Sequence, residues 1–413
     1  MPPLSVMFKT VSTDCNLDCH YCYYRESLQG SRAQRRIENE VLERFIPEYM
    51  EYVADVRQAN IAWQGGEPTL AGLPFFQRVV QMQEQHAAPG TVISNAIQTN
   101  AVLVDDAWGT FFAQYAFLVG VSLDGPQEIH DQMRIRRGGQ GSFRDVMRGI
   151  EVLRRYNVDL NILCVLGPHN IERVGDLIRF FRGEGFSHVQ FIPAMDFQAI
   201  EPEKPVNYLI SPEAYGEFLV VAFDSWFQGG GPTISVRIFD NFLQSYVNVP
   251  NDLCVHSNSC EAGIVVEWDG SAYPCDFYIH PAWKLGNVLD RPLSKLVNEP
   301  RRIAFVLQKI PLPMECVHCE WLSVCRGGCP RNRMGSATAA SPDYFCRAYL
   351  RFFPHAHENL RSLGRDLERY REYVRNRASG PRGRNEPCPC GSGKKRKQCC
   401  EHPHRQQSYV FHQ

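Results

Sequence analysis

The sequence predicts an α/β fold: a partial (β/α)6 TIM-like barrel, followed by a Cys-rich domain and a small Cys-rich tail. Over roughly the first 195 residues, short β-rich runs alternate with helical patterns, and this alternation is then lost. Of the 16 cysteines, all but Cys164 fall into three compact clusters. Serial βα units predict a parallel sheet, and in such folds the chemistry lies on loops at the carboxyl ends of the strands.

The candidate strands are short, rich in Val, Ile or Phe, and bounded by Gly, Pro, Asn or Asp. They are Ser5–Thr10, Asn60–Gln64, Ile93–Gln98, Phe117–Ser122, Asp159–Leu166 and His188–Pro193. Helical patterns occupy Glu38–Val56, Pro74–Gln85, Asp105–Ala113, Phe143–Tyr156 and Ile171–Gly183. Ser142, with Asp145 three residues later, predicts a capping box at the start of the fourth helix.

We expect three domains, over residues 1–235, 236–376 and 377–413, the last opening with a linker. The 413 residues are 44% hydrophobic with a formal net charge of -1, which argues against disorder and against bulk nucleic-acid binding. No apolar run approaches the roughly 18 residues of a membrane helix, and the N-terminus lacks a signal-peptide pattern. We therefore expect a cytoplasmic protein without membrane contact, whose clustered cysteines bind metal.

The first cluster, Cys15, Cys19 and Cys22, follows the first strand with the spacing C-x3-C-x2-C. Such a loop can hold three irons of one [4Fe–4S] cluster by thiolate, so that the fourth iron stays open for a substrate. The alternative is a zinc site that includes His20. However, His20 adjoins Cys19, which strains tetrahedral geometry, and structural zinc favours C-x-x-C pairs.

Two further groups of cysteines follow. Eight thiols between residues 254 and 346 suffice for two sites of four thiolates each, and two structural zinc ions fit their spacing equally well. Cys388, Cys390, Cys399 and Cys400 follow as C-x-C-x8-C-C in the tail, which indicates a metal-nucleated fold rather than a disordered Cys-rich segment. Cys164 lies in an apolar strand pattern and is expected to be a buried, inert thiol.

The three-Cys loop resembles the signature of radical S-adenosylmethionine (SAM) enzymes. The resemblance includes Gly65-Gly66-Glu67-Pro68 after the second strand, a turn that in this family binds the amino group of SAM. Glycines let the backbone approach a ligand closely, and a carboxylate offers an anion for an ammonium group. The resemblance implies that SAM is bound by Tyr21, Gly65, Gly66, Glu67, Ser122, Arg134 and Met195. Taken alone, Arg134 could equally be a solvated surface charge.

The eight-Cys region resembles the SPASM extension of that family, which holds two auxiliary [4Fe–4S] clusters and brings the implied total to three. By resemblance, one is ligated by Cys254, Cys260, Cys275 and Cys329, and the other by Cys316, Cys319, Cys325 and Cys346. The tail resembles the SEC-C zinc motif, which implies bound zinc. The basic run Lys394–Lys397 is either merely solvated or a contact for the ribosome or the export machinery.

The segment Tyr273-Pro274-Cys275-Asp276-Phe277-Tyr278 resembles the one that carries the catalytic base in anaerobic sulfatase-maturating enzymes, and the likeness runs from Met1 to about Phe353. It implies that Asp276 is the base, although a loop Asp more often caps its own loop. The implied reaction oxidises a Cys or Ser of an unfolded or nascent sulfatase to Cα-formylglycine with a 5′-deoxyadenosyl radical. A low-potential donor such as flavodoxin or ferredoxin would supply electrons.

Three rival functions remain. The nearest is another SPASM-type peptide modifier, such as a thioether-forming maturase; these commonly carry a peptide-recognition domain before the barrel, for which a first strand near Ser5 leaves no room. A carbohydrate- or cofactor-tailoring radical SAM enzyme fits the Cys-Asp-Phe-Tyr segment less well. A zinc-dependent scaffold protein is the alternative from a different class.

Among the implied SAM contacts, Met195 differs from the others. Relatives carry another apolar residue at Met195, so only a backbone or apolar contact is implied there.

Overall fold

The computed structural model describes residues 4–24, 35–195, 208–228, 231–260, 263–333 and 341–378, together with Lys395. The strands are β1 (Ser5–Lys9), β2 (Gln58–Gln64), β3 (Val92–Thr99), β4 (Leu118–Ser122), β5 (Leu160–Leu166), β6 (His188–Pro193), β7 (Ser235–Val236), β8 (Ile264–Val266), β9 (Ser271–Tyr273) and β10 (Gly286–Asn287). They form one sheet in the order β10-β9-β8-β1-β2-β3-β4-β5-β6-β7.

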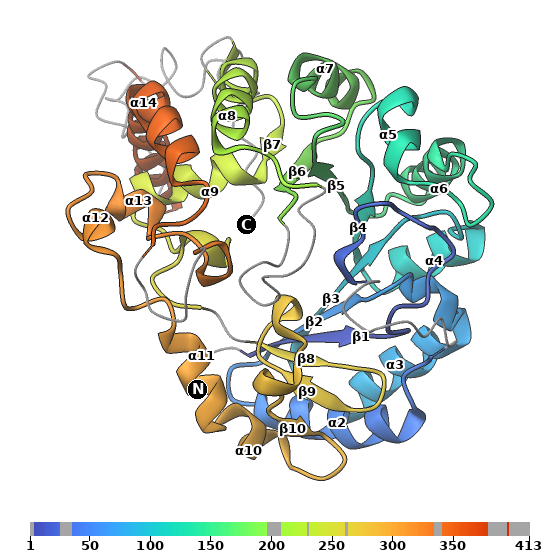
Figure 1. Ribbon diagram of the computed structural model, residues 1–413. Helices are drawn as coiled ribbons and strands as arrows, with labels where there is room; N and C mark the ends of the chain where they lie inside the picture. The colour runs from blue at the N-terminus through green and yellow to red at the C-terminus, as the bar shows by residue number, and fades with distance from the viewer. Residues whose placement is uncertain are drawn as a thin grey trace.

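The longer helices are α2 (Asn39–Tyr52), α3 (Leu73–His86), α4 (Asp106–Gln114), α5 (Gln127–Met133), α6 (Phe143–Arg155), α7 (Val174–Gly183), α8 (Pro212–Trp226), α9 (Arg237–Tyr246), α11 (Pro300–Leu307) and α14 (Cys346–Ala378). Shorter helices in the Cys-rich part are α10 (Leu293–Val297), α12 (Met314–Val317) and α13 (Leu322–Cys325). Figure 1 shows the strands as an arc with α2 to α7 on its outer side. The predicted partial barrel is confirmed, because the six predicted strands are β1 to β6 and all pair in parallel.

Alternation along the strands sorts side chains between the outer core and the inner side of the arc. In β1, Phe8 is fully buried and stacks on Trp63 of β2, with ring centroids 4.8 Å apart. Phe8 also meets Phe45 of α2 edge-on at 5.3 Å. The neighbouring Lys9 and Gln64 instead line an inner cavity. The two-residue period of a strand therefore places polar groups inside the arc and apolar groups beneath the helices.

The Cys-rich part extends the same sheet at both ends of the arc. After α8 comes β7, which pairs in parallel with β6 and continues the alternation beyond the predicted range. At the other end, β8 pairs in parallel with β1, and β9 and β10 follow antiparallel. Helix α14 packs on α8 through aromatic contacts such as Phe223 with Phe352, whose ring centroids lie 5.5 Å apart. One hydrophobic core therefore joins the barrel to the Cys-rich part.

The predicted capping box at α6 is wrong. Ser142 occupies the N-cap position, but its hydroxyl makes no hydrogen bond to the first turn of the helix. It donates instead to the carbonyl of Arg134, at 2.7 Å, and lies 3.0 Å from Nε2 of His130. The carboxylate of Asp145 pairs with Arg136 rather than reaching back to the cap. The neighbouring loop therefore outcompetes the helix terminus for this hydroxyl.

Within these ranges, no helix combines the length and the apolar character needed to cross a membrane. The predicted tail ligands Cys388, Cys390, Cys399 and Cys400 lie outside the described residues.

Candidate active site

The predicted site residues from widely separated segments line one cavity of about 940 Å³. The lining includes all three thiols of the first loop and all the predicted SAM contacts: Tyr21, Gly65, Gly66, Glu67, Ser122, Arg134 and Met195. It also includes Asp276 and one complete set of SPASM thiols, Cys254, Cys260, Cys275 and Cys329. The other set, Cys316, Cys319, Cys325 and Cys346, does not line the cavity. The fold thus brings together the residues that the sequence grouped by motif.

The Gly-Gly-Glu-Pro turn is fastened directly to the first Cys loop. Gly65 and Gly66 have positive φ values of 86° and 51°, a region that favours glycine. A Cβ atom on Gly66 would lie only 1.8 Å from the carbonyl oxygen of Asp14, the residue before Cys15. That carbonyl accepts a hydrogen bond from the backbone N–H of Glu67, at 2.8 Å. Glycine is therefore required here by the close approach of the two loops.

The carboxylate of Glu67 is buried and fixes this turn to the end of β3. It accepts hydrogen bonds from the N–H and hydroxyl of Thr69, at 3.1 and 2.6 Å. It also accepts from the Thr99 hydroxyl at 2.7 Å and the Asn100 N–H at 2.7 Å. Burial raises the pKa of Glu67, although these hydrogen bonds act in the opposite direction. These contacts give Glu67 a structural role, and its contact with SAM stays a prediction.

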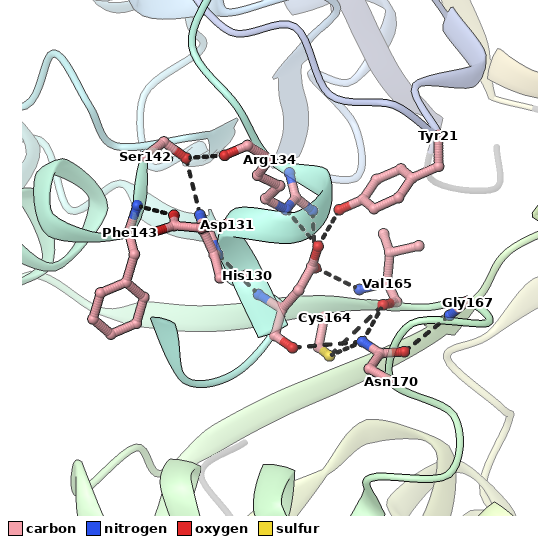
Figure 2. Close-up of polar contacts among 11 residues, drawn as sticks. Tyr21, His130, Asp131, Arg134, Ser142, Phe143, Cys164, Val165, Gly167 and Asn170 are labelled. Atoms are coloured by element: carbon pink, nitrogen blue, oxygen red, sulfur yellow. Dashed lines mark hydrogen bonds and ion pairs between the residues drawn. The ribbon is translucent and has the colours of Figure 1, made fainter. Parts of the chain in front are cut away.

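Arg134 is buried in an ion pair and is not a solvated surface charge. It is 7% exposed, and its Nε and Nη2 donate to the carboxylate of Asp124 at 2.9 and 3.2 Å. The hydroxyl of Tyr21 and the N–H of Val165 also donate to this carboxylate, as Figure 2 shows for the groups that converge there. Burial alone would raise the pKa of Asp124, but the charge of Arg134 and the hydrogen bonds from Arg134 and Tyr21 hold it below its ordinary value.

His130 and Ser142 support this ion pair through a series of hydrogen bonds. Burial lowers the pKa of His130 to about 4, so the ring is neutral near pH 7. Its Nδ1 accepts from the N–H of Asp124 at 3.3 Å, and its Nε2 therefore carries the proton that faces Ser142. Because the hydroxyl of Ser142 donates to the carbonyl of Arg134, these hydrogen bonds form a continuous chain (Figure 2). His130 was not predicted as a site residue, because no motif marks its position in the short helix α5.

Asp276 begins the 3-10 turn η4 (Asp276–Tyr278) and is held by groups from β1 and the first Cys loop. The hydroxyl of Tyr23 donates to its Oδ2 at 3.3 Å, and Nζ of Lys9 lies 4.0 Å from the same oxygen. Lys9 is 1% exposed and also donates to Oε1 of Gln64 at 3.3 Å. Tyr23 and Lys9 lie outside the turn that carries Asp276, while the thiol of the adjacent Cys275 lies 3.6 Å from the other oxygen, Oδ1. Lys9 and Tyr23 were not predicted as site residues, although a Lys within a short apolar strand is itself unusual.

The SPASM thiols divide into two groups by their mutual electrostatic influence. Burial is the main cause that raises the pKa of Cys260 to about 12, and Cys329 and Cys254 contribute to the same rise. Burial likewise raises the pKa of Cys346 to about 11, with added contributions from Cys316 and Cys319. Two further thiols follow the same division, with Cys275 influenced by Cys329 and Cys254, and Cys325 by Cys346 and Cys316. This grouping is the one that the resemblance implied, and the assignment of these thiols as cluster ligands stays a prediction.

The donor sets fit iron–sulfur clusters. Two sets offer four thiols each, and the first loop offers three, one of which, Cys15, accepts a hydrogen bond from the N–H of Leu17 at 3.4 Å. Burial raises the pKa of Cys19 to about 11, so a positively charged group is needed there to hold its thiolate. In the part of the chain that the structure describes, no three His, Cys, Asp or Glu side chains converge on the position of a single metal ion.

Comparisons with known proteins agree with this site. Family models match residues 10–181 as the radical SAM superfamily, residues 258–320 as the iron–sulfur cluster-binding SPASM domain and residues 384–401 as the SEC-C motif. The cysteine-type anaerobic sulfatase-maturating enzyme of Clostridium perfringens is 35% identical over 374 residues, which cover 89% of this chain and 100% of that protein. The serine-type enzyme of Bacteroides thetaiotaomicron is 33% identical over 383 residues, covering 88% of this chain and 92% of that protein.

Solved structures show the same relationship. Native anSMEcpe with bound AdoMet and Cp18Cys peptide matches with a TM-score of 0.83 at 35% identity, covering 88% of this chain and 100% of that chain. SuiB of Streptococcus suis, bound to precursor peptide SuiA, matches with a TM-score of 0.57 at 14% identity, covering 83% of this chain and 76% of that chain, and so shares the fold. This chain therefore belongs to the anaerobic sulfatase-maturating enzymes, a radical SAM family with a SPASM domain.

Proposed function

We propose that this protein oxidises a Cys or Ser side chain of an unfolded or nascent sulfatase to Cα-formylglycine under anaerobic conditions. The observation that carries the proposal is that Asp276 and the three-Cys loop line the same cavity. A substrate side chain placed there can lose a hydrogen atom and a proton in one site. Removal of hydrogen from an unactivated Cβ–H is beyond any side-chain base at neutral pH, so a radical cofactor is needed.

Cys15, Cys19 and Cys22 are proposed to hold a [4Fe–4S] cluster with one open iron. When bound, this cluster and SAM supply a 5′-deoxyadenosyl radical that takes the hydrogen atom from Cβ. The proposed SAM contacts are Tyr21, Gly65, Gly66, Glu67, Ser122, Arg134 and Met195, all of which line the cavity. Asp124 engages Nε and Nη2 of Arg134, which has five N–H donors, and a further N–H of this guanidinium is proposed to bind the SAM carboxylate.

Asp276 is proposed to take the proton from the substrate thiol or hydroxyl. Tyr23 and Lys9 hold its carboxylate in the cavity, and a positioned base typically contributes about 10²–10⁴-fold. After loss of the hydrogen atom and this proton, the substrate must still lose one electron. Serine then gives the aldehyde directly, whereas cysteine gives a thioaldehyde that water hydrolyses with release of sulfide.

The remaining electron is proposed to leave through the SPASM domain. Cys275 adjoins Asp276, so the thiol set that lines the cavity is the first available exit. Two auxiliary [4Fe–4S] clusters on Cys254, Cys260, Cys275 and Cys329 and on Cys316, Cys319, Cys325 and Cys346 bring the proposed total to three. A low-potential flavodoxin or ferredoxin is proposed to reduce the first cluster.

The tail is proposed to recruit partners and not to take part in the chemistry. Cys388, Cys390, Cys399 and Cys400 can form a closed tetrahedral zinc site without an open position. The basic run Lys394–Lys397 beside them suits acidic partners such as the ribosome, or the export machinery.

The test is anaerobic incubation of the reconstituted protein with SAM, a reductant and two sulfatase-motif peptides, one with Cys and one with Ser at the target position. Mass spectrometry should find formylglycine in at least one peptide, together with 5′-deoxyadenosine. A thioether product without any aldehyde would contradict the proposal and favour a different SPASM-type peptide modifier. A scaffold protein would form neither 5′-deoxyadenosine nor a modified peptide.

A further inference from the structure

We propose that Lys309 raises the reduction potential of the auxiliary cluster on Cys254, Cys260, Cys275 and Cys329, so that this cluster more readily accepts the substrate electron. The inference rests on the proposed function, because it takes the assignment of a cluster to these four thiols as given. It concerns a residue that takes no part in binding SAM, in the base chemistry or in ligating iron.

Lys309 is a buried cation that is held against the loop bearing the first of these thiols. It follows α11 and is only 1% exposed. Its Nζ donates to the carbonyls of Cys254 and Val255, both at 2.8 Å, in the 3-10 turn η3 (Cys254–His256). Among the described residues it makes no ion pair with a carboxylate. No described carboxylate therefore cancels its charge by a direct ion pair.

The thiols around Lys309 interact with this charge. The pKa of Lys309 is lowered overall because of burial, and Cys329, Cys254 and Cys260 act in the opposite direction. Reciprocally, Lys309 lowers the pKa of Cys260, which burial raises overall. All three thiols belong to the proposed ligand set that lines the cavity. The hydrogen bonds of the ammonium group to the carbonyls of Cys254 and Val255 place its charge directly beside that set.

Nearby acidic groups act in the opposite direction. Asp276 adjoins Cys275, and the carboxylate of Asp343 accepts a hydrogen bond from the N–H of Cys329 at 2.9 Å. Each negative charge disfavours addition of an electron to a cluster bound here. Arg333, which is 8% exposed, supplies a second buried cation and donates to the carbonyl of Lys309 at 3.3 Å. Lys309 is thus placed to offset the carboxylates that surround this ligand set.

Reduction adds one negative charge to the cluster, and a nearby buried cation stabilises that reduced form. Inside a protein the interaction is stronger than in water and is weakly screened by salt. The net charge and the solvent exposure around an iron–sulfur cluster are established determinants of its potential. Removal of the charge of Lys309 should therefore make reduction of this cluster harder.

The experiment measures auxiliary-cluster potentials by redox titration of the fully reconstituted protein, followed by electron paramagnetic resonance. Lys309→Gln keeps a donor for the two carbonyls but removes the charge, and Lys309→Met keeps the apolar stem. Either should shift the reduction equilibrium of one auxiliary cluster by at least about tenfold, which is about 59 mV for a one-electron couple. Lys309→Arg keeps the charge and should stay close to wild type. Lys295→Gln, on an exposed position of α10, is the matched control.

Unshifted potentials in both neutral variants, with normal iron content, would overturn the inference. It is also overturned if both neutral variants fail to load iron while Lys309→Arg loads normally, because Lys309 would then serve cluster assembly. Absence of two auxiliary signals in the wild-type protein would instead refute the cluster assignment of the proposed function. The two failures are therefore distinguishable.

Discussion

Replacement of Asp124 by Asn tests whether the buried ion pair organises the proposed SAM site. The substitution keeps the shape of the side chain but removes its charge. Asp124 is fully buried, and its carboxylate accepts two hydrogen bonds from Arg134, which is itself 7% exposed. Breaking a buried pair leaves an uncompensated charge, at a cost of about 3–5 kcal/mol. We expect the free energy of unfolding of Asp124→Asn to fall by this amount.

The assay is anaerobic urea denaturation followed by circular dichroism, with SAM affinity measured on the same preparations. Because Asp124 also orients Tyr21, SAM binding should weaken by about tenfold or more, which is about 1.4 kcal/mol. The control is Glu217→Gln, whose carboxylate lies 3.4 Å from Arg351 in a pair that is 61% and 57% exposed. An exposed pair of this kind contributes about 1 kcal/mol or less. An Asp124→Asn variant as stable as the control would refute the reasoning.

Three further predictions follow from the same geometry. Gly66→Ala places a Cβ atom 1.8 Å from the carbonyl oxygen of Asp14, so the first Cys loop should lose its iron and 5′-deoxyadenosine should no longer be released. Normal release would show that this loop and the Gly-Gly-Glu-Pro turn can separate without loss of function. Because the pKa of His130 is lowered from 6.5 to about 4, the unfolded chain binds the proton first, and stability should fall as the pH drops from 6.5 toward 4. Urea denaturation in that pH interval should show that the difference in unfolding free energy between wild type and His130→Gln changes by up to about 1.4 kcal/mol per pH unit. A difference that stays constant with pH would contradict a neutral, buried ring. Truncation before Ala378 should leave turnover of a short peptide nearly unchanged but should weaken maturation of a full-length sulfatase. The contribution of the tail to that maturation should decrease with added salt. Loss of peptide turnover would contradict the proposal that the tail recruits partners and takes no part in the chemistry.

The barrel was predictable because its signals are local. Each of β1 to β6 is a short apolar run between turn residues, and the predicted helices α2, α3, α4, α6 and α7 are found within a few residues of their expected bounds. The strand β8 was missed because it is only three residues long and pairs with β1, more than 250 residues earlier in the sequence. Such pairing leaves no periodicity within the segment itself.

Site residues that belong to a sequence motif were predictable, whereas residues that reach the site only through tertiary contacts were not. The first Cys loop, the Gly-Gly-Glu-Pro turn and one of the two SPASM thiol sets were all identified by motif, and all line one cavity. Lys9 and His130 were missed because a Lys or His in isolation indicates a solvated surface, and only the fold supplies their buried partners. Ser142 was misassigned for the same reason, since its partners lie on the loop that carries Arg134. Local patterns predict the ligands, whereas the groups that position them depend on tertiary contacts.

The central claim is that radical formation and proton abstraction are separate tasks within one cavity, and Asp276→Asn tests it most directly. In the proposed mechanism SAM cleavage depends on the first Cys loop and the SAM contacts but not on Asp276, so 5′-deoxyadenosine should still form at close to the wild-type rate. Formylglycine should fall by about 10²–10⁴-fold, the usual contribution of a positioned base. Asp290→Asn, at an exposed position of the same domain, should change neither product. Equal loss of 5′-deoxyadenosine and formylglycine in Asp276→Asn would contradict the account and assign Asp276 a structural role in its loop.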